Sequence, residues 1–148
     1  FDARGVEGAD YVGTYTDMLR DKVFEDGSAD VIICHGSLHT GKREEVRKNV
    51  AICSRWLKPG GYMLVRAKCN FHWAQTDVNS YNWRIEDVHR WSNDFNLKVH
   101  TPVEVCYAKD KRGELMARFV WWWKKLSRDE WLDSKTKVQT KHINWKIV

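Results

Sequence analysis

Residues 30–65 constrain the possible fold more than any other part of this chain. Residues 31–34 form a short β-branched run, which is typical of a strand buried on both faces of a parallel sheet. Apolar residues then recur at helical spacing over residues 42–57, before a Lys-Pro-Gly-Gly turn ends the helix. A second apolar run, residues 62–66, follows at once. Strand, helix and strand make a βαβ unit, so we predict an α/β fold with a right-handed parallel connection.

The chain just after the first strand is the best candidate for a binding site. Ligands of open α/β sheets lie outside the carboxyl ends of the strands, and Gly36 lets a bound molecule come close to the backbone. Cys34 and Gly36 are therefore candidate ligand contacts. His35 is the candidate catalytic base, because an unperturbed imidazole titrates near neutral pH. The alternative for His35 is a loop histidine that hydrogen-bonds the backbone.

The order of these segments resembles a known family. The turn-rich line Glu25–Asp30, the strand, the amphipathic helix that ends in Arg55–Gly61 and the strand after it are similar to the fourth and fifth strand region of class I S-adenosylmethionine-dependent methyltransferases. The sequence is most similar to the small, type 11-like members of this family. The resemblance implies a Rossmann-like sheet with helices on its faces, S-adenosylmethionine as cofactor, and methyl transfer to an acceptor that remains unknown.

The same resemblance assigns roles to residues near the N-terminus. We predict a strand over residues 11–15, after the end of an earlier strand, and the family then places Asp2 where a carboxylate accepts hydrogen bonds from the ribose hydroxyls. A solvated terminal aspartate is the alternative. The family usually has Gly-Asp after the third strand, but here Thr14 follows the glycine. Either Thr14 replaces the acid that faces adenine or Asp17 supplies it, with Met18 beside it for backbone contacts.

One part of the family pattern is missing. The sequence contains no G-x-G-x-x-G motif, whose backbone N–H groups would hold the methionine portion of the cofactor. We therefore expect a truncated methyltransferase-like domain that lacks the first strand and is incomplete at its N-terminus, with reduced activity or none. An apolar strand whose neighbour is lost exposes an edge that can pair with another chain. This predicts a homodimer formed through the edge of the 30–34 strand.

The C-terminal half completes the predicted domain. Residues 67–82 mix aromatic and amide side chains, which suits either acceptor recognition or an ordinary surface loop. The apolar spacing over residues 84–95 predicts a second amphipathic helix. Alternating residues on both sides of the turn at 110–113 then predict an antiparallel β-hairpin that closes the sheet. Residues 1–126 are thus the methyltransferase-like domain, and residues 127–148 are a basic, polar tail.

Composition limits the other function classes. The four cysteines form no C-x-x-C pair, so we expect reduced, mostly core cysteines and no metal site. No apolar run approaches the roughly 20 residues that cross a bilayer, which predicts a cytoplasmic protein without membrane contact. A formal charge of +5 and nine tryptophans keep a nucleic-acid-binding protein open. A non-catalytic interaction or assembly module is the other alternative to an enzyme.

Overall fold

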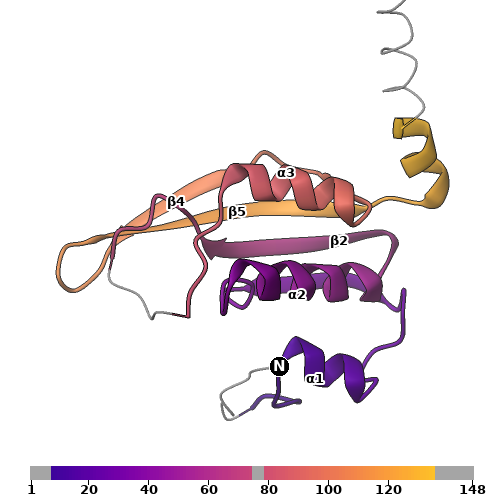
Figure 1. Cartoon of the computed structure of the whole chain (residues 1–148), viewed down its shortest axis with the longest axis horizontal. Helices are drawn as coiled ribbons and strands as arrows, with labels where there is room; N and C mark the ends of the chain where they lie inside the picture. The colour runs from indigo at the N-terminus through magenta and orange to yellow at the C-terminus, as the bar shows by residue number, and fades with distance from the viewer. Residues whose placement is uncertain (1–7, 75–78, 136–148) are drawn as a thin grey trace, which may run out of the picture.

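A computed structural model gives the fold of residues 8–74 and 79–135. Three labelled helices and five strands follow one another in these residues, and a further helical segment follows the last strand (Figure 1). Their order along the chain is α1 (Tyr15–Arg20), β1 (Ala29–His35), α2 (Arg43–Trp56), β2 (Leu57–Lys68), α3 (Ile85–Asp94), β3 (Leu97–Val99), β4 (Glu104–Lys109) and β5 (Leu115–Lys125).

The five strands form one mixed sheet. β1 pairs with β2 in parallel, with Ile32 opposite Met63, as the βαβ pattern predicts. β5 lies antiparallel on the other side of β2, and both β3 and β4 pair with the far side of β5. The predicted α/β class and the closing hairpin are confirmed. The first arm of the hairpin is divided, because β3 and β4 are separated by residues 100–103.

All three helices pack on one face of this sheet. Side chains alternate along a strand, and the buried ones on the central strands lie on the same face, since Met63 is directly opposite Trp123. Tyr15 of α1 stacks on Trp56 of α2, which joins these two helices. The other large, fully buried residues of this core are Met18, Leu38, Val46, Val50, Leu57, Val65, Trp83, Val88, Trp91 and Trp121.

Trp83 is a core residue, although it directly follows residues 67–82, which we expected either to recognise the acceptor or to form an ordinary surface loop. Its ring lies 4.7 Å from the ring of Trp91 and 5.1 Å from that of Trp121, measured between centroids. Its indole N–H donates to the Leu38 carbonyl at 2.6 Å. A buried indole needs such an acceptor, because an unpaired N–H in the core is costly. The loop before α3 is therefore anchored to the sheet.

The prediction that the 31–34 strand is buried on both faces is wrong. Cys34 is buried, but Val31 and Ile33 on the other face are 52% and 65% exposed. None of the described helices covers this second face. In the described part of the chain β1 pairs only with β2, so its outer edge is open, which is the condition on which the predicted dimer depends.

The predicted strand over residues 11–15 is also wrong, because α1 begins at Tyr15. The signal that was missed is a capping box. The Thr14 hydroxyl accepts from the Asp17 N–H, and the Asp17 carboxylate accepts from the Thr14 N–H. These two bonds start a helix of six residues whose Tyr15 and Met18 are buried.

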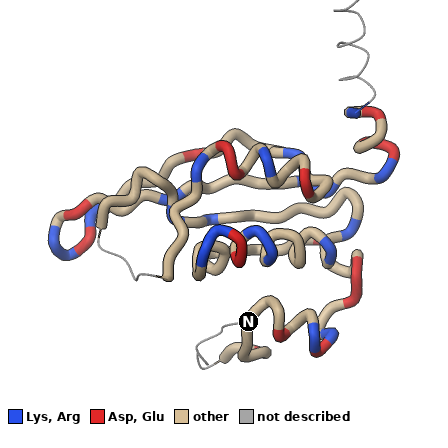
Figure 2. The backbone as a smooth tube through the Cα atoms, viewed as in Figure 1, with Lys and Arg blue, Asp and Glu red and all other residues tan. Residues whose placement is uncertain are grey.

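The C-terminal part follows the predicted alternation. Trp121 and Trp123 are buried while Trp122 between them is partly exposed on the opposite face. Beyond β5, residues 128–135 form a helix, whereas the rest of the predicted tail lies outside the described residues. The boundary at residue 126 stays a prediction. Acidic and basic residues are interspersed along the helices and at the hairpin turn (Figure 2). None of the described helices is long and apolar enough to span a membrane.

Candidate functional site

The carboxyl end of β1 combines an exposed histidine with an unusual backbone. Gly36 has a φ of +82°, in the left-handed region that glycine adopts without strain. A Cβ atom built there would make an ordinary van der Waals contact with His39 Cε1, at 3.8 Å, and would meet no closer atom. The Gly36 N–H donates to the Arg66 carbonyl at 2.9 Å, which ties the end of β1 to β2. The backbone at Gly36 is therefore partly exposed and held in place.

His35 is exposed and contacts a cation. Its Nε2 lies 3.0 Å from Nη1 of Arg66. A guanidinium only donates hydrogen bonds, so Nε2 accepts and the neutral ring carries its proton on Nδ1. His35 is therefore placed where the sequence predicts a base. Arg66 must leave Nε2 before that atom can take a proton.

The buried Tyr15 hydroxyl contacts the end of β1 from the core side of the sheet. The Tyr15 hydroxyl lies 2.7 Å from Ser37 Oγ and 3.6 Å from Cys34 Sγ. Burial raises the pKa of Tyr15 well above its usual value. The hydrogen bond with Cys34, and then burial, raise the pKa of the Cys53 thiol. Cys34, Cys53 and Cys69 are all buried, as predicted, and Cys106 is exposed. The Cys34 side chain therefore faces the core, and only its backbone remains a candidate ligand contact.

The predicted adenine contacts are engaged within α1. Thr14 and Asp17 cap the helix, and Asp17 also lies 3.1 Å from Arg20. The hydrogen bonds from the Thr14 backbone and hydroxyl, together with Arg20, lower the pKa of Asp17. Met18 is buried in the core. Tyr15, which follows Thr14 in α1, connects this helix with the end of β1. The roles of Thr14, Asp17 and Met18 toward a cofactor stay predictions. Asp2 lies outside the described residues.

The sequence analysis missed a group of basic residues on the open face of the sheet. Lys68 of β2 is directly opposite Arg118 of β5, and Arg66 stands on the same face two residues before Lys68. Arg118 Nη1 lies 2.7 Å from Nδ1 of His72, a buried ring in the loop after β2. We call Arg66, Lys68 and Arg118 the basic cluster. Period-two spacing on two adjacent strands is the signal that could have found it.

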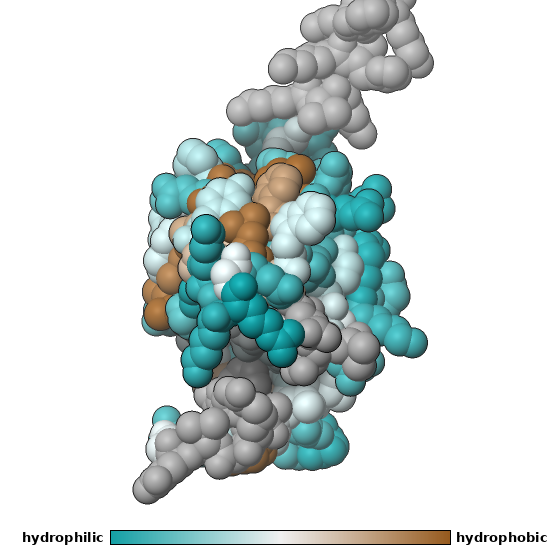
Figure 3. All heavy atoms as spheres, turned by 90° about the vertical axis from the view of Figure 1, so that its left-hand side faces the viewer, coloured by the Kyte–Doolittle hydropathy of each residue, from teal (hydrophilic) through white to brown (hydrophobic). Residues whose placement is uncertain are grey.

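Two histidines next to the basic cluster are held neutral. Burial, and then the charges of Lys68, Arg118, His72 and Arg66, lower the pKa of His39 to about 4. Burial and Arg118 also lower the pKa of His72. The Lys68 N–H donates to His39 Nδ1 at 3.1 Å, as the neutral ring allows. The region is therefore electropositive. Figure 3 looks at the end of the molecule where β2 finishes and shows hydrophilic surface interrupted by hydrophobic patches.

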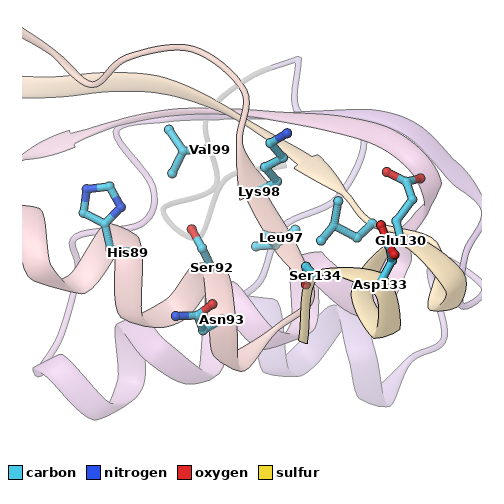
Figure 4. Close-up of a pocket in the computed structure, with 10 residues that line it drawn as sticks. His89, Ser92, Asn93, Leu97, Lys98, Val99, Glu130, Asp133 and Ser134 are labelled. Atoms are coloured by element: carbon cyan, nitrogen blue, oxygen red, sulfur yellow. The ribbon is translucent and has the colours of Figure 1, made fainter. Parts of the chain in front are cut away.

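A separate cavity lies at the other end of the sheet. It has a volume of about 570 Å³ and is bounded by α3, β3 and the 128–135 helix (Figure 4). His89, Lys98 and Glu130 supply polar groups to its lining. The β3 residues in this lining pair with the end of β5, which in turn pairs with the start of β2. The cavity is therefore distinct from the end of β1.

Most of the β1–α2–β2 unit lies within a segment that matches a family of known proteins. Residues 6–65 match the type 11 methyltransferase domain. This part of the chain is therefore similar to a methyltransferase domain. A curated relative, phosphoethanolamine N-methyltransferase 1 of Triticum aestivum, is 28% identical over 121 residues, which is 72% of this chain. Because the match covers 24% of that relative, the chain spans about a quarter of the wheat protein's length.

Solved structures show that the chain has a methyltransferase-like fold. An S-adenosylmethionine-dependent methyltransferase from Methanosarcina mazei superposes with a TM-score of 0.60 and 16% identity, over 84% of this chain and 74% of that one. Another, from Archaeoglobus fulgidus, gives a TM-score of 0.57 and 9% identity, over 78% of this chain and 66% of that one. The predicted class I, Rossmann-like fold is therefore confirmed.

Proposed function

We propose that this chain binds S-adenosylmethionine at the carboxyl end of β1 and transfers its methyl group to an acceptor bound beside it. The observation that carries the proposal is the left-handed Gly36 next to the exposed His35 at the end of β1, within the segment that matches the methyltransferase domain. A backbone without a Cβ at this place fits the close approach of a ligand. When bound, the cofactor supplies an electrophilic methyl group.

The chain's own residues then have two tasks. Methyl transfer is an in-line displacement, so the backbone of Cys34 and Gly36 serves chiefly to position the ligand. His35 accepts the proton that a nitrogen or oxygen acceptor sheds, once Arg66 releases Nε2. The Tyr15–Ser37 hydrogen bond keeps the turn after β1 in a fixed place during this exchange.

Phosphoethanolamine is the first acceptor to test. The wheat relative is named for N-methylation of this compound, and its amine must lose a proton when it is methylated. A base at the β1 end suits such an acceptor. The similarity covers only part of the wheat protein. The acceptor of this chain is therefore to be identified by a methyl-transfer assay with phosphoethanolamine.

The binding step has a matched pair of variants. Gly36 and Gly60 both have a φ of +82°, so Gly36→Ala and Gly60→Ala impose the same backbone strain at the two ends of the β1–β2 pair. We expect S-adenosylhomocysteine, titrated calorimetrically, to bind wild type and Gly60→Ala, with binding at least about tenfold weaker to Gly36→Ala. Equal affinities, or no heat with any of the three proteins at millimolar ligand, would support a non-catalytic module instead.

We also propose that the open edge of β1 pairs with a second copy of the chain. The strand has seven residues centred on Ile32, so full antiparallel pairing about a two-fold axis places Val31 opposite the partner copy's Ile33. Both side chains are exposed on the same face and would form one apolar patch across the axis. The edge carries no proline, and the residues from Val31 to Cys34 carry no charge that would oppose such pairing.

A further inference from the structure

We propose that the basic cluster of Arg66, Lys68 and Arg118 binds the phosphate group of a small phosphate monoester, which is the methyl acceptor. This inference rests on the proposed methyl transfer, because it names the chemical class of acceptor for the same site. It depends on the placement of the cluster, on its unusual hydrogen-bond partners and on its distance along the sheet from His35.

The three cations face one another across two strands. Lys68 and Arg118 are directly paired residues of β2 and β5, and side chains of such pairs lie about 5 Å apart at Cβ. Arg66 lies on the same face, opposite Val120. Like charges at this spacing repel, and the charge of Arg66 contributes, after burial, to a lowered pKa of Arg118. An anion between them would remove this repulsion.

The partners of the two arginines are neutral rather than acidic. Arg66 donates to His35, and Arg118 donates to His72 and to the Ala117 carbonyl at 3.1 Å. Among the residues the structure describes, no carboxylate lies in ion-pair contact with Arg66 or Arg118. Arg43, Arg47 and Arg55, by contrast, each have such a partner. A bound anion would supply the counter-ion that Arg66 and Arg118 lack among the described residues.

The histidines orient these cations without competing for an anion. His72 Nδ1 accepts from the Ala117 N–H at 3.0 Å as well as from Arg118, so it holds the guanidinium at the strand. Lys68 Nζ donates to Ser80 Oγ at 2.9 Å, which tethers its ammonium. The charge of Asp110 opposes the lowered pKa of His72 only as the last of its causes. The charges of Lys68, Arg118 and Arg66 all lower the pKa of His39, so the field at this ring is positive.

The location connects the anion site with the proposed reaction. Arg66 is in register with His35, the candidate base, and the Gly36 N–H bonds to the Arg66 carbonyl. A small molecule with a phosphate on the basic cluster can thus reach the end of β1 with its other end. Guanidinium groups bind phosphate oxygens in pairs, which fixes orientation as well as supplying affinity. A phosphate monoester that carries an amine fits both requirements.

The test compares three small probes on wild-type protein. We expect phosphoethanolamine and inorganic phosphate to bind in calorimetric titrations at low salt, and ethanolamine to give no heat. Arg66→Gln and Arg118→Gln should each weaken phosphoethanolamine binding by about tenfold or more. Arg90→Gln, which removes the same charge from the exposed side of α3, should bind like wild type. Equal affinities in all four proteins, or binding of ethanolamine as tight as that of phosphoethanolamine, would overturn the proposal.

A second readout needs no variant. Bound phosphate should raise the pKa of His39 from about 4, because an added anion offsets the surrounding cations. The ring resonances of His39, followed by NMR against pH with and without phosphate, report this shift, and an unchanged titration would contradict the assignment. A single-stranded oligonucleotide that binds more tightly than phosphoethanolamine, with steep loss in salt and in Arg66→Gln, would also overturn it in favour of nucleic acid.

S-adenosylhomocysteine titrations on the same samples separate the two proposals. A wild-type protein that binds S-adenosylhomocysteine but no phosphate contradicts the anion site alone. Phosphate binding by a protein that binds no S-adenosylhomocysteine contradicts the proposed methyl transfer and leaves the anion site in place.

Discussion

Asp87 joins the two helices that cover the sheet, so its removal should lower stability strongly. Its carboxylate is 6% exposed and lies 3.0 Å from Nη2 of Arg43 on α2. It also accepts from the Tyr81 hydroxyl at 2.5 Å and caps α3 by accepting from the Arg84 N–H at 3.0 Å. Burial, and then this carboxylate, raise the pKa of Tyr81 to about 12. Asp87→Ala removes the bonds to all three partners at once.

The size of the effect follows from these bonds. Loss of the cap costs about 1 kcal/mol, and loss of hydrogen bonds to a buried charge costs about 1.5–3 kcal/mol. Arg43 is 36% exposed and can regain water, which reduces the sum to about 3 kcal/mol. Asp94 provides the matched control, because it joins the same two helices through Arg47 at 3.4 Å while both side chains are at least 35% exposed. Asp94→Ala should cost less than about 1 kcal/mol.

Urea unfolding followed by circular dichroism measures both variants. With a slope of about 1–3 kcal/mol/M, the midpoint of Asp87→Ala should fall by about 1–3 M and that of Asp94→Ala by much less. Equal midpoints for the two variants would refute the reasoning that burial, and not the mere presence of an ion pair, decides the contribution. A fall smaller than about 1 kcal/mol for Asp87→Ala would refute it as well.

Three further predictions concern the other parts of the account. Thr14→Ala should lower the free energy of unfolding by about 1 kcal/mol through loss of the α1 cap, measured by urea unfolding; an unchanged midpoint would contradict that role. The pKa of His39 is lowered in the folded protein, so the unfolded chain takes up a proton at this residue first as the pH falls. The stability that depends on the neutral ring is therefore fully present above pH 6.5 and is lost as the pH falls toward about 4. That loss, at most about 3 kcal/mol before solvent screening, should be smaller in His39→Gln than in wild type when unfolding midpoints at pH 7 and 4.5 are compared. Ile33→Lys should convert a dimer into a monomer in sedimentation experiments, whereas a monomeric wild type would refute the pairing of β1.

The βαβ unit could be predicted because its signals are local. The apolar spacing of α2 and the Lys58–Gly61 turn mark a helix and its end, and the observed helix Arg43–Trp56 agrees within a residue or two. The hairpin around Asp110 is equally local, since this side chain accepts from the N–H groups of Arg112 and Glu114 within the turn. Short-range hydrogen bonds and periodicity fix such elements before any tertiary contact forms.

The errors arose where tertiary context decides. The β-branched run of β1 is compatible with burial on both faces, but no pattern within the run says whether a helix covers each face. Trp83 was assigned to a loop because its neighbours are polar and irregular, yet it packs against Trp91 and Trp121 from distant elements. The start of α1 could have been predicted, because Thr14 and Asp17 stand at capping-box spacing.

One part of the candidate site could be predicted from the sequence, and the other part could not. His35 and Gly36 followed from the rule that ligands gather at strand ends, and the structure places them at an accessible end. Arg66 and Arg118 are 52 positions apart in the sequence and meet only through the pairing of β2 with β5. Their histidine partners come from the end of β1 and from the loop after β2. A site assembled across strands in this way is visible only once the register is known.

The most direct test of the central claim is hydrogen exchange of the wild-type protein with and without S-adenosylhomocysteine. Binding at the end of β1 predicts slower exchange of the amides of residues 34–39 and no change in residues 89–99 and 126–135, which bound the cavity beside α3. Protection confined to that cavity, or no change anywhere at saturating ligand, would contradict the account.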